Sequence, residues 1–121
     1  MLTRVLLLMA GLFLVAANSN AEQPPAYATC VACHGAAGEG NPALNAPAIA
    51  GQTAAYLERQ LRHFKSGVRG GDSSDALGVQ MRGMAAQLSD EDIAAISSWL
   101  AAEPRPAVTS IRCHDPHPGS S

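Results

Sequence analysis

Aromatic residues are scarce in this chain of 121 residues, which has one Trp, two Tyr and two Phe. Hydrophobic residues nevertheless make up 47% of the sequence, and many of them are Ala, which fills little core volume. A chain of this length has room for one domain, and so small a domain buries only a modest fraction of its surface. Such domains usually need a disulfide, a metal or a cofactor, so we expect a stabilising group here.

Other features are missing, and their absence excludes classes of protein. The formal net charge is −2, so the chain lacks the basic excess of a nucleic-acid binder. The alternation of apolar and polar residues that is typical of strands is almost absent, which argues against a βαβ unit. The chain has no internal repeat. The sequence therefore predicts a small all-α protein.

The first 21 residues have the features of a secretory signal peptide. Arg4 provides a positive start, residues 5–17 form an apolar run, and residues 19–21 offer a cleavage site before Glu22. An uncleaved membrane anchor is the alternative, but the run is shorter than the roughly 20 apolar residues of a bilayer span. We therefore expect export into an oxidising compartment, in which cysteines normally pair.

Two of the three cysteines form a motif. Cys30-Val31-Ala32-Cys33-His34 matches C-x-x-C-H, the pattern for covalent attachment of haem. Two residues between the thiols let one helical turn reach both vinyl groups, and the adjacent histidine then points at the iron. A thioredoxin-like redox pair shares C-x-x-C but expects a βαβ context. A zinc site would need two more ligands, and the only candidates lie in the C-terminal tail: Cys113, His114 and His117.

The motif predicts one haem c, bound through thioethers to Cys30 and Cys33, with His34 as the proximal ligand of the iron. A buried porphyrin would also supply the bulk that an aromatic-poor core lacks. The cofactor is therefore the stabilising group that we expect for a domain of this size.

Periodicity and capping signals predict the helices. Residues 24–34 form an opening helix with the motif, and residues 35–51 form a loop rich in Gly, Ala, Pro and Asn. Residues 53–66 form a clear helix that ends at Gly67. Residues 68–87 contain four glycines and are expected to be a second loop. The last helix has Ser89 as its cap, Asp92 in a variant capping box and a stop before Pro104.

Four segments of the chain, in this order, resemble a class I bacterial cytochrome c: YATCVACHG (27–35), APAIAG (46–51), YLERQLRHFKSG (56–67) and MRGMAAQLSDEDI (81–93). They are similar to one half of the periplasmic dihaem cytochromes and to small monohaem relatives. The resemblance implies a periplasmic protein with short helices wrapped around one haem, the first and last helices crossing. It also implies that the carbonyl of Pro47 accepts the second ring N–H of His34, which would orient the imidazole.

The sixth ligand decides what such a haem can do. Methionine opposite histidine saturates the iron and raises the potential, which suits electron transfer, whereas an open position suits gas binding or peroxide chemistry. The candidates are Met81 and Met84. The resemblance implies Met81, which stands eight residues before Ser89 as in the family, in a loop that Gly78 and Gly83 would bring close to the haem. Met84 is the alternative, and core packing is the other role open to either side chain.

The chain thus divides into a secretory signal peptide (1–21), a cytochrome c domain (22–103) and a Pro-rich tail (104–121) that we expect to be disordered. Cys113 in the tail is either a free thiol or one that pairs between molecules. His63, on the predicted helix 53–66, is expected at the surface or at the boundary of the core. We expect a monomer, which Cys113 could convert into a disulfide dimer.

The expected function is periplasmic electron transfer through one haem with His/Met ligation, without catalysis. The alternatives are a haem c subunit of a larger exported oxidoreductase, and a haem enzyme or gas sensor with a labile sixth site. Expected partners are a donor reductase or dehydrogenase and an acceptor oxidase or reductase, with at most loose docking on a membrane surface. Five cations form either a solvated face or a docking surface for an acidic partner: Arg59, Arg62, Lys65, Arg69 and Arg82.

Overall fold

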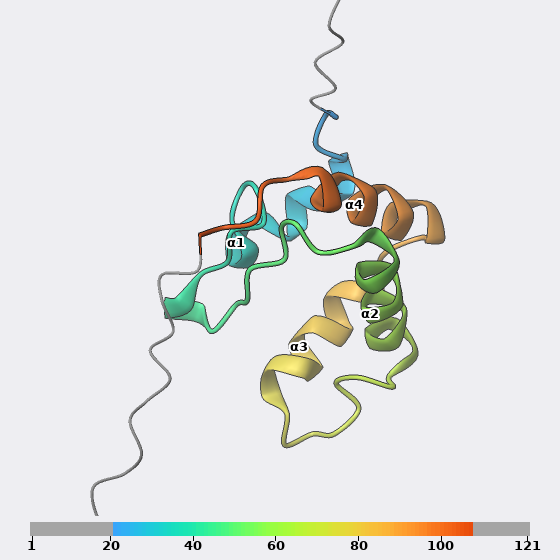
Figure 1. Ribbon diagram of the computed structural model, residues 1–121. Coiled ribbons are helices and arrows are strands. Elements are labelled where there is room, and N and C mark those ends of the chain that lie inside the picture. The colour runs from blue at the N-terminus through green and yellow to red at the C-terminus, as the bar shows by residue number, and fades with distance from the viewer. Residues whose placement is uncertain (1–20, 108–121) are drawn as a thin grey trace, which may run out of the picture.

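Helices make up most of residues 21–107, which are the residues that this computed structural model describes. No strand occurs within that range, which contains only an isolated bridge between Asn41 and Ala46. The prediction of an all-α fold is confirmed. In chain order the helices are the 3-10 helix η1 (Pro25–Thr29), α1 (Val31–His34), the 3-10 helix η2 (Pro42–Leu44), α2 (Ala54–Ser66), α3 (Ala76–Ala85) and α4 (Asp90–Ala102) (Figure 1).

The opening helix predicted for residues 24–34 is divided in two at Cys30. The 3-10 helix η1 begins after Pro24, whose carbonyl accepts from the N–H of Tyr27 at 2.9 Å. The single turn α1 follows, and the N–H of His34 donates to the carbonyl of Cys30 at 2.8 Å. Gly35 ends it with a φ of 84°. The turn therefore presents the C-x-x-C-H motif as one short rigid unit.

Helix α2 agrees with the prediction at both ends. The hydroxyl of Thr53 caps it by accepting from the N–H of Tyr56 at 3.3 Å. Gly67 ends it in the left-handed conformation, with a φ of 79°, which costs glycine little. Leu57 and Phe64 are buried on one face of the helix, as the helical spacing predicts.

The prediction of a loop over residues 68–87 is wrong for the ten residues of α3. Asp75 caps this helix by accepting from the N–H of Gly78 at 2.9 Å. Two glycines inside a helix lower its intrinsic stability by about 1 kcal/mol each, so local signals do not reveal it. Packing against α2 and the preceding loop compensates: Gly70, with a φ of 68°, lies against the carbonyl of Gly78, where a Cβ would clash.

Helix α4 begins with the predicted capping box. Ser89 and Asp92 each accept a hydrogen bond from the backbone N–H of the other, both at 3.0 Å. The helix ends before Pro104. Its apolar face forms much of the core, which consists of Tyr27, Leu57, Leu88, Ile93, Ile96, Trp99 and Leu100.

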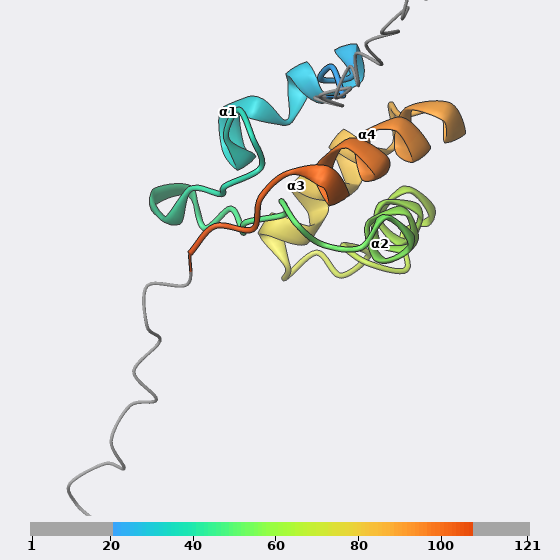
Figure 2. The same cartoon turned by 45° about the horizontal axis from the view of Figure 1, so that its top comes forward.

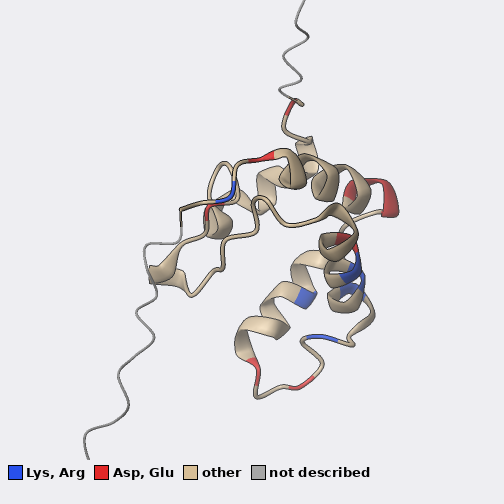
Figure 3. Ribbon diagram, viewed as in Figure 1, with Lys and Arg blue, Asp and Glu red and all other residues tan. Residues whose placement is uncertain are grey.

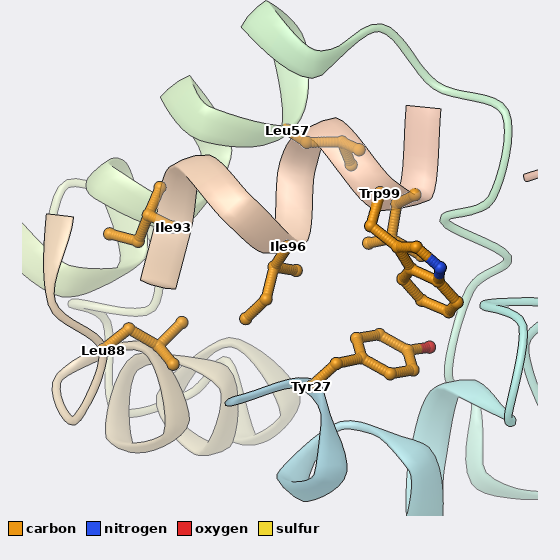
Figure 4. Packing of buried hydrophobic residues seen from close by; sticks show 7 residues of the cluster. Tyr27, Leu57, Leu88, Ile93, Ile96 and Trp99 are labelled. Carbon is orange, nitrogen blue, oxygen red and sulfur yellow. The ribbon is translucent and has the colours of Figure 1, made fainter. Parts of the chain in front are cut away.

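The first and last helical segments meet through two aromatic rings. The rings of Tyr27 and Trp99 lie 4.7 Å apart between centroids and are inclined at 55°, and Figure 4 shows them facing each other across the core. Figure 2 shows η1 alongside α4 from a second direction. Because aromatic side chains are so few in this chain, this pair supplies a large share of its aromatic packing.

The segment after α4 folds back onto the loop before α2. The N–H of Gly51 donates to the carbonyl of Leu100, and the guanidinium of Arg105 donates to the carbonyl of Gly51, each at 2.9 Å. Packing against the domain thus continues two residues past the predicted boundary at 103. Among residues 21–107 no helix is long and apolar enough to cross a membrane. The rest of the predicted tail, with Cys113, His114 and His117, and residues 1–20 of the predicted signal peptide lie outside the described residues.

Tyr27 provides a test of this packing. Its hydroxyl donates to the carbonyl of Gly35 at 2.8 Å, so Tyr27→Phe should lower the free energy of unfolding by about 1–2 kcal/mol. Burial raises the pKa of the Tyr27 phenol well above its ordinary value. The unfolded chain therefore ionises this phenol first as the pH rises, and the wild type should lose stability above about pH 10.

Denaturant titrations of the wild type and variants at neutral and alkaline pH measure both effects. Tyr27→Phe should show a smaller alkaline loss of stability than the wild type does. Tyr56→Phe is the matched control, because it removes the hydroxyl of an exposed tyrosine and should leave the free energy of unfolding at neutral pH close to the wild-type value. An equal alkaline loss in wild type and Tyr27→Phe would contradict the assignment.

Candidate haem site

A cavity of about 520 Å³, partly open to solvent, is lined by residues of all four α-helices and of the loop between α1 and α2. This volume falls in the range of about 300–1,000 Å³ that is typical of cofactor and ligand sites. Most of its wall is apolar. The main apolar contributors are Leu57, Leu61 and Phe64 from α2, Leu77 from α3, and Ile96 and Leu100 from α4.

The C-x-x-C-H motif lies in one part of the wall. Cys30, Cys33 and His34 all line the cavity, and the side chain of His34 is buried. Its Nδ1 is 2.9 Å from the carbonyl oxygen of Pro47, so the hydrogen bond that the resemblance implied is present. With Nδ1 donating, the ring orientation is fixed and Nε2 is left without a hydrogen.

The cysteines do not have the properties of a redox-active pair. Burial raises the pKa of the Cys30 thiol, whereas reactive thiols in C-x-x-C redox motifs have lowered values. Residues 21–107 also contain no group of three or more His, Cys, Asp and Glu side chains that could hold a metal ion. The described residues therefore provide neither the thiolate nor the ligand cluster that the two alternatives require.

Helix α3 brings both candidate methionines to the cavity. Met81 and Met84, one turn apart, line the same space as His34. Met81 is partly buried, whereas the side chain of Met84 is 36% exposed. Met84 also borders a second hollow of about 160 Å³, next to Leu88. Both methionines thus reach the cavity, and Met81 is the less exposed of the two.

The loop expected around Met81 is a helix. Met81 stands on a helix and not in a loop, and Gly78 and Gly83 do not bring a loop toward the cavity. Gly78 is buried beside the carboxylate of Asp75, and a Cβ on Gly83 would meet no atom within 4 Å. The preference for Met81 rests on the eight-residue spacing before Ser89, which the resemblance implies, and on its lower exposure. His63 on α2 is partly buried and is not among the lining residues.

Residues 25–102 match the family model for cytochrome c. The chain belongs to the cytochrome c family. It is 40% identical over 75 residues to cytochrome c-554(548) of Halomonas halodenitrificans, an alignment that covers 62% of this cytochrome and 84% of that one. It is also 40% identical over 94 residues to cytochrome c4 of Azotobacter vinelandii, covering 78% and 42% of the two chains.

Another relative is named thiosulfate dehydrogenase electron acceptor, from Thiomonas intermedia (strain K12). It is 41% identical over 91 residues, which are 75% of this cytochrome and 39% of that protein. The crystal structure of reduced recombinant cytochrome c4 from Pseudomonas stutzeri superposes with a TM-score of 0.54 and 39% identity, over 62% of this chain and 38% of the other. The chain thus spans about two fifths of these longer relatives, in agreement with the predicted similarity to one half of the dihaem cytochromes.

These findings confirm the class I cytochrome c fold and one covalently bound haem c. The residues of the cavity fit this group, because a largely apolar space holds the cysteine pair and a hydrogen-bonded histidine in one part of its wall. Helix α3 adds two thioethers to the same wall. The sequence identified the haem motif and both candidate methionines. It did not show that the methionines stand on a helix, α3.

Sequence reasoning grouped Arg69 with four other cations and did not place it, or Asp75, in the cavity wall. Figure 3 shows basic residues on α2, on α3 and in the loop between them, while acidic residues mark the start of α4. Of the five cations considered for docking, only Arg69 lines the cavity. Arg62 pairs with Glu58 at 3.0 Å instead. No periodic signal could have identified Arg69, because it follows the glycine that ends α2.

Proposed function

We propose that this cytochrome c is an exported carrier of single electrons, with His34 and Met81 as the axial ligands of its haem iron. The observation that carries the proposal is that both side chains belong to the wall of one largely apolar cavity, on α1 and α3. A histidine and a methionine together fill the coordination of the iron and raise its potential, which suits reversible electron transfer. When bound, the haem supplies the ferric/ferrous couple.

The protein residues orient and shield that couple. The carbonyl of Pro47 holds Nδ1 of His34 and sets the direction and basicity of the imidazole. Leu57, Phe64 and Ile96 belong to the apolar wall and would keep water away from a bound haem. A dry and rigid site limits the reorganisation that accompanies a change of charge, so the same surroundings suit both oxidation states.

Location and partners follow from the same proposal. Residues 1–21 would direct export to the periplasm, and a dehydrogenase is a suitable electron donor, since one relative is named as the electron acceptor of thiosulfate dehydrogenase. A haem subunit within an oxidoreductase complex is the second candidate, since that relative is named for the dehydrogenase whose electrons it accepts. Co-purification of a catalytic subunit would favour it over a free carrier.

A redox titration of the purified protein, with reduced-minus-oxidised spectra, tests the electron-transfer assignment. We expect one reversible one-electron transition and no binding of carbon monoxide to the reduced protein at neutral pH. Rapid carbon monoxide binding would instead indicate a vacant or labile sixth site, as in a haem enzyme or gas sensor.

Covalent attachment gives a separate prediction. Acid-acetone extraction should leave the haem on the wild-type protein, because thioethers to Cys30 and Cys33 survive acid. Replacement of both cysteines by Ala should abolish the covalent holoprotein, whereas Cys113→Ala is the matched control and should keep it. Complete extraction of the colour from the wild type would disprove the attachment.

A further inference from the structure

Arg69 lies at the mouth of the haem cavity. It is the one Lys or Arg among the described residues of the cavity wall, and it is exposed to solvent. The other charged residue of the wall is Asp75, whose carboxylate accepts from the N–H of Gly78 at 2.9 Å. The wall thus presents a single cation beside an otherwise largely apolar space.

Three contacts of its own hold Arg69 in this position. Its backbone N–H donates to the carbonyl of His63 at 3.0 Å. The next residue, Gly70, packs against the backbone of α3 at Gly78. Its guanidinium lies over the ring of Phe64, 4.4 Å from the centroid, and donates to Oε1 of Gln60 at 2.7 Å. Phe64 and Gln60 also line the cavity, so stacking and the hydrogen bond keep the guanidinium at its edge.

Most of the hydrogen-bonding capacity of this guanidinium is unused. Arginine has five N–H donors, and Arg69 uses one of them within residues 21–107. No described carboxylate lies within ion-pair distance of it, since the one ion pair in that range joins Arg62 to Glu58. A fixed, unpaired guanidinium favours a carboxylate as its partner. The haem brings two carboxylates, its propionates, into this cavity.

We propose that Arg69 binds a propionate carboxylate of the haem, and that Gln60 and Phe64 hold its guanidinium in place to do so. The proposal rests on the haem occupying the cavity. The pair keeps the propionate ionised, because a nearby cation lowers the pKa of a carboxyl group. The cation also favours the ferrous state, which carries one positive charge less, and so raises the potential.

Redox titration of four holoproteins tests the proposal: wild type, Arg69→Gln, Arg69→Lys and the matched control Arg62→Gln. Arg62→Gln removes the same charge from α2 outside the cavity wall, so its potential should stay close to the wild-type value. Arg69→Gln should lower the potential clearly more, and Arg69→Lys should restore most of the difference. Equal potentials in Arg69→Gln and Arg62→Gln would overturn the proposal.

The pH profile of the potential adds a readout that a purely structural role would not change. An unpaired propionate binds a proton more tightly in the ferrous than in the ferric protein, so the potential of Arg69→Gln should fall as the pH rises through that window. The wild type should show a flatter profile. Titratable side chains that share the wall are Asp75, Tyr56, Cys30, Cys33 and His34.

Asp75 is the one other carboxyl group in the wall, so Arg69→Gln with Asp75→Asn separates the two titrations. The fall of the potential with rising pH should persist in the double variant. If this pH dependence disappears, the proposal is overturned. If Arg69→Gln yields no holoprotein, Gln60→Glu replaces it, because the new carboxylate competes for Arg69 and should lower the potential too. An unchanged potential in Gln60→Glu would contradict the proposal, whereas failure of the haem assignment would appear as extractable haem in the wild type.

Discussion

Without its haem, this cytochrome is expected to lose most of its helical structure at room temperature. In the variant with Cys30→Ala and Cys33→Ala, the cavity of about 520 Å³ would have to stay empty or fill with water. A fully enclosed apolar cavity costs about 24 cal/mol per Å³, so this partly open one should cost at most on the order of 10 kcal/mol. The total stability of a small domain is about 5–15 kcal/mol. The folded apoprotein would therefore have little or no stability left.

Far-ultraviolet circular dichroism and thermal unfolding measure this loss. The haem-free variant should show low helix content and no cooperative transition, while Cys113→Ala holoprotein should unfold like the wild type. Absorbance must verify that no haem remains in the sample, because His34 could retain haem without thioethers. Native helix content with a cooperative transition in truly haem-free protein would show that the cavity does not need its cofactor to stay folded.

Met81→Ala is expected to remove the sixth ligand. The weak long-wavelength absorption band from methionine sulfur to ferric iron should disappear, and the potential should fall, because a thioether favours the ferrous state. The vacant position should then bind carbon monoxide in the reduced protein. Visible spectra, a redox titration and carbon monoxide binding to the same sample measure these three changes.

Met84→Ala is the matched control, one helical turn away on the same wall. It should keep the band and the potential. Its cost in stability should fall below the roughly 2–5 kcal/mol of a fully buried methionine, because its side chain is 36% exposed. Loss of the band in Met84→Ala alone would assign the ligand to Met84. A band that persists in both single variants would mean that either methionine can bind the iron.

The elements that the sequence predicts well are those with signals close together in the chain. Helix α2 has Thr53 and Gly67 at its ends, and α4 has Ser89 and Asp92 in a capping box. These caps satisfy backbone groups within a few residues, so their energy depends little on the rest of the fold. The same holds for the C-x-x-C-H motif, whose spacing fits one turn of helix.

Helix α3 shows where sequence reasoning fails. Its glycines argue for a loop, and its only local signal is the cap by Asp75. The helix is stabilised by contacts with α2 and by the close packing of Gly70 against Gly78. These contacts join segments that are separate in the chain, so no pattern within α3 reveals them. That Met81 is the ligand stays a prediction, and it does not depend on the expected loop, because Met81 lines the cavity from a helix.

By itself, the sequence determined the haem motif, the cysteines that hold the cofactor and the helices α2 and α4, because each depends on neighbours within a turn or two. Only the tertiary structure decided that α3 is a helix facing the motif, that Tyr27 meets Trp99, and that Arg69 stands at the cavity mouth. These features depend on pairs of segments far apart in the chain. Their free energy comes from burying surface between helices, which no local pattern encodes.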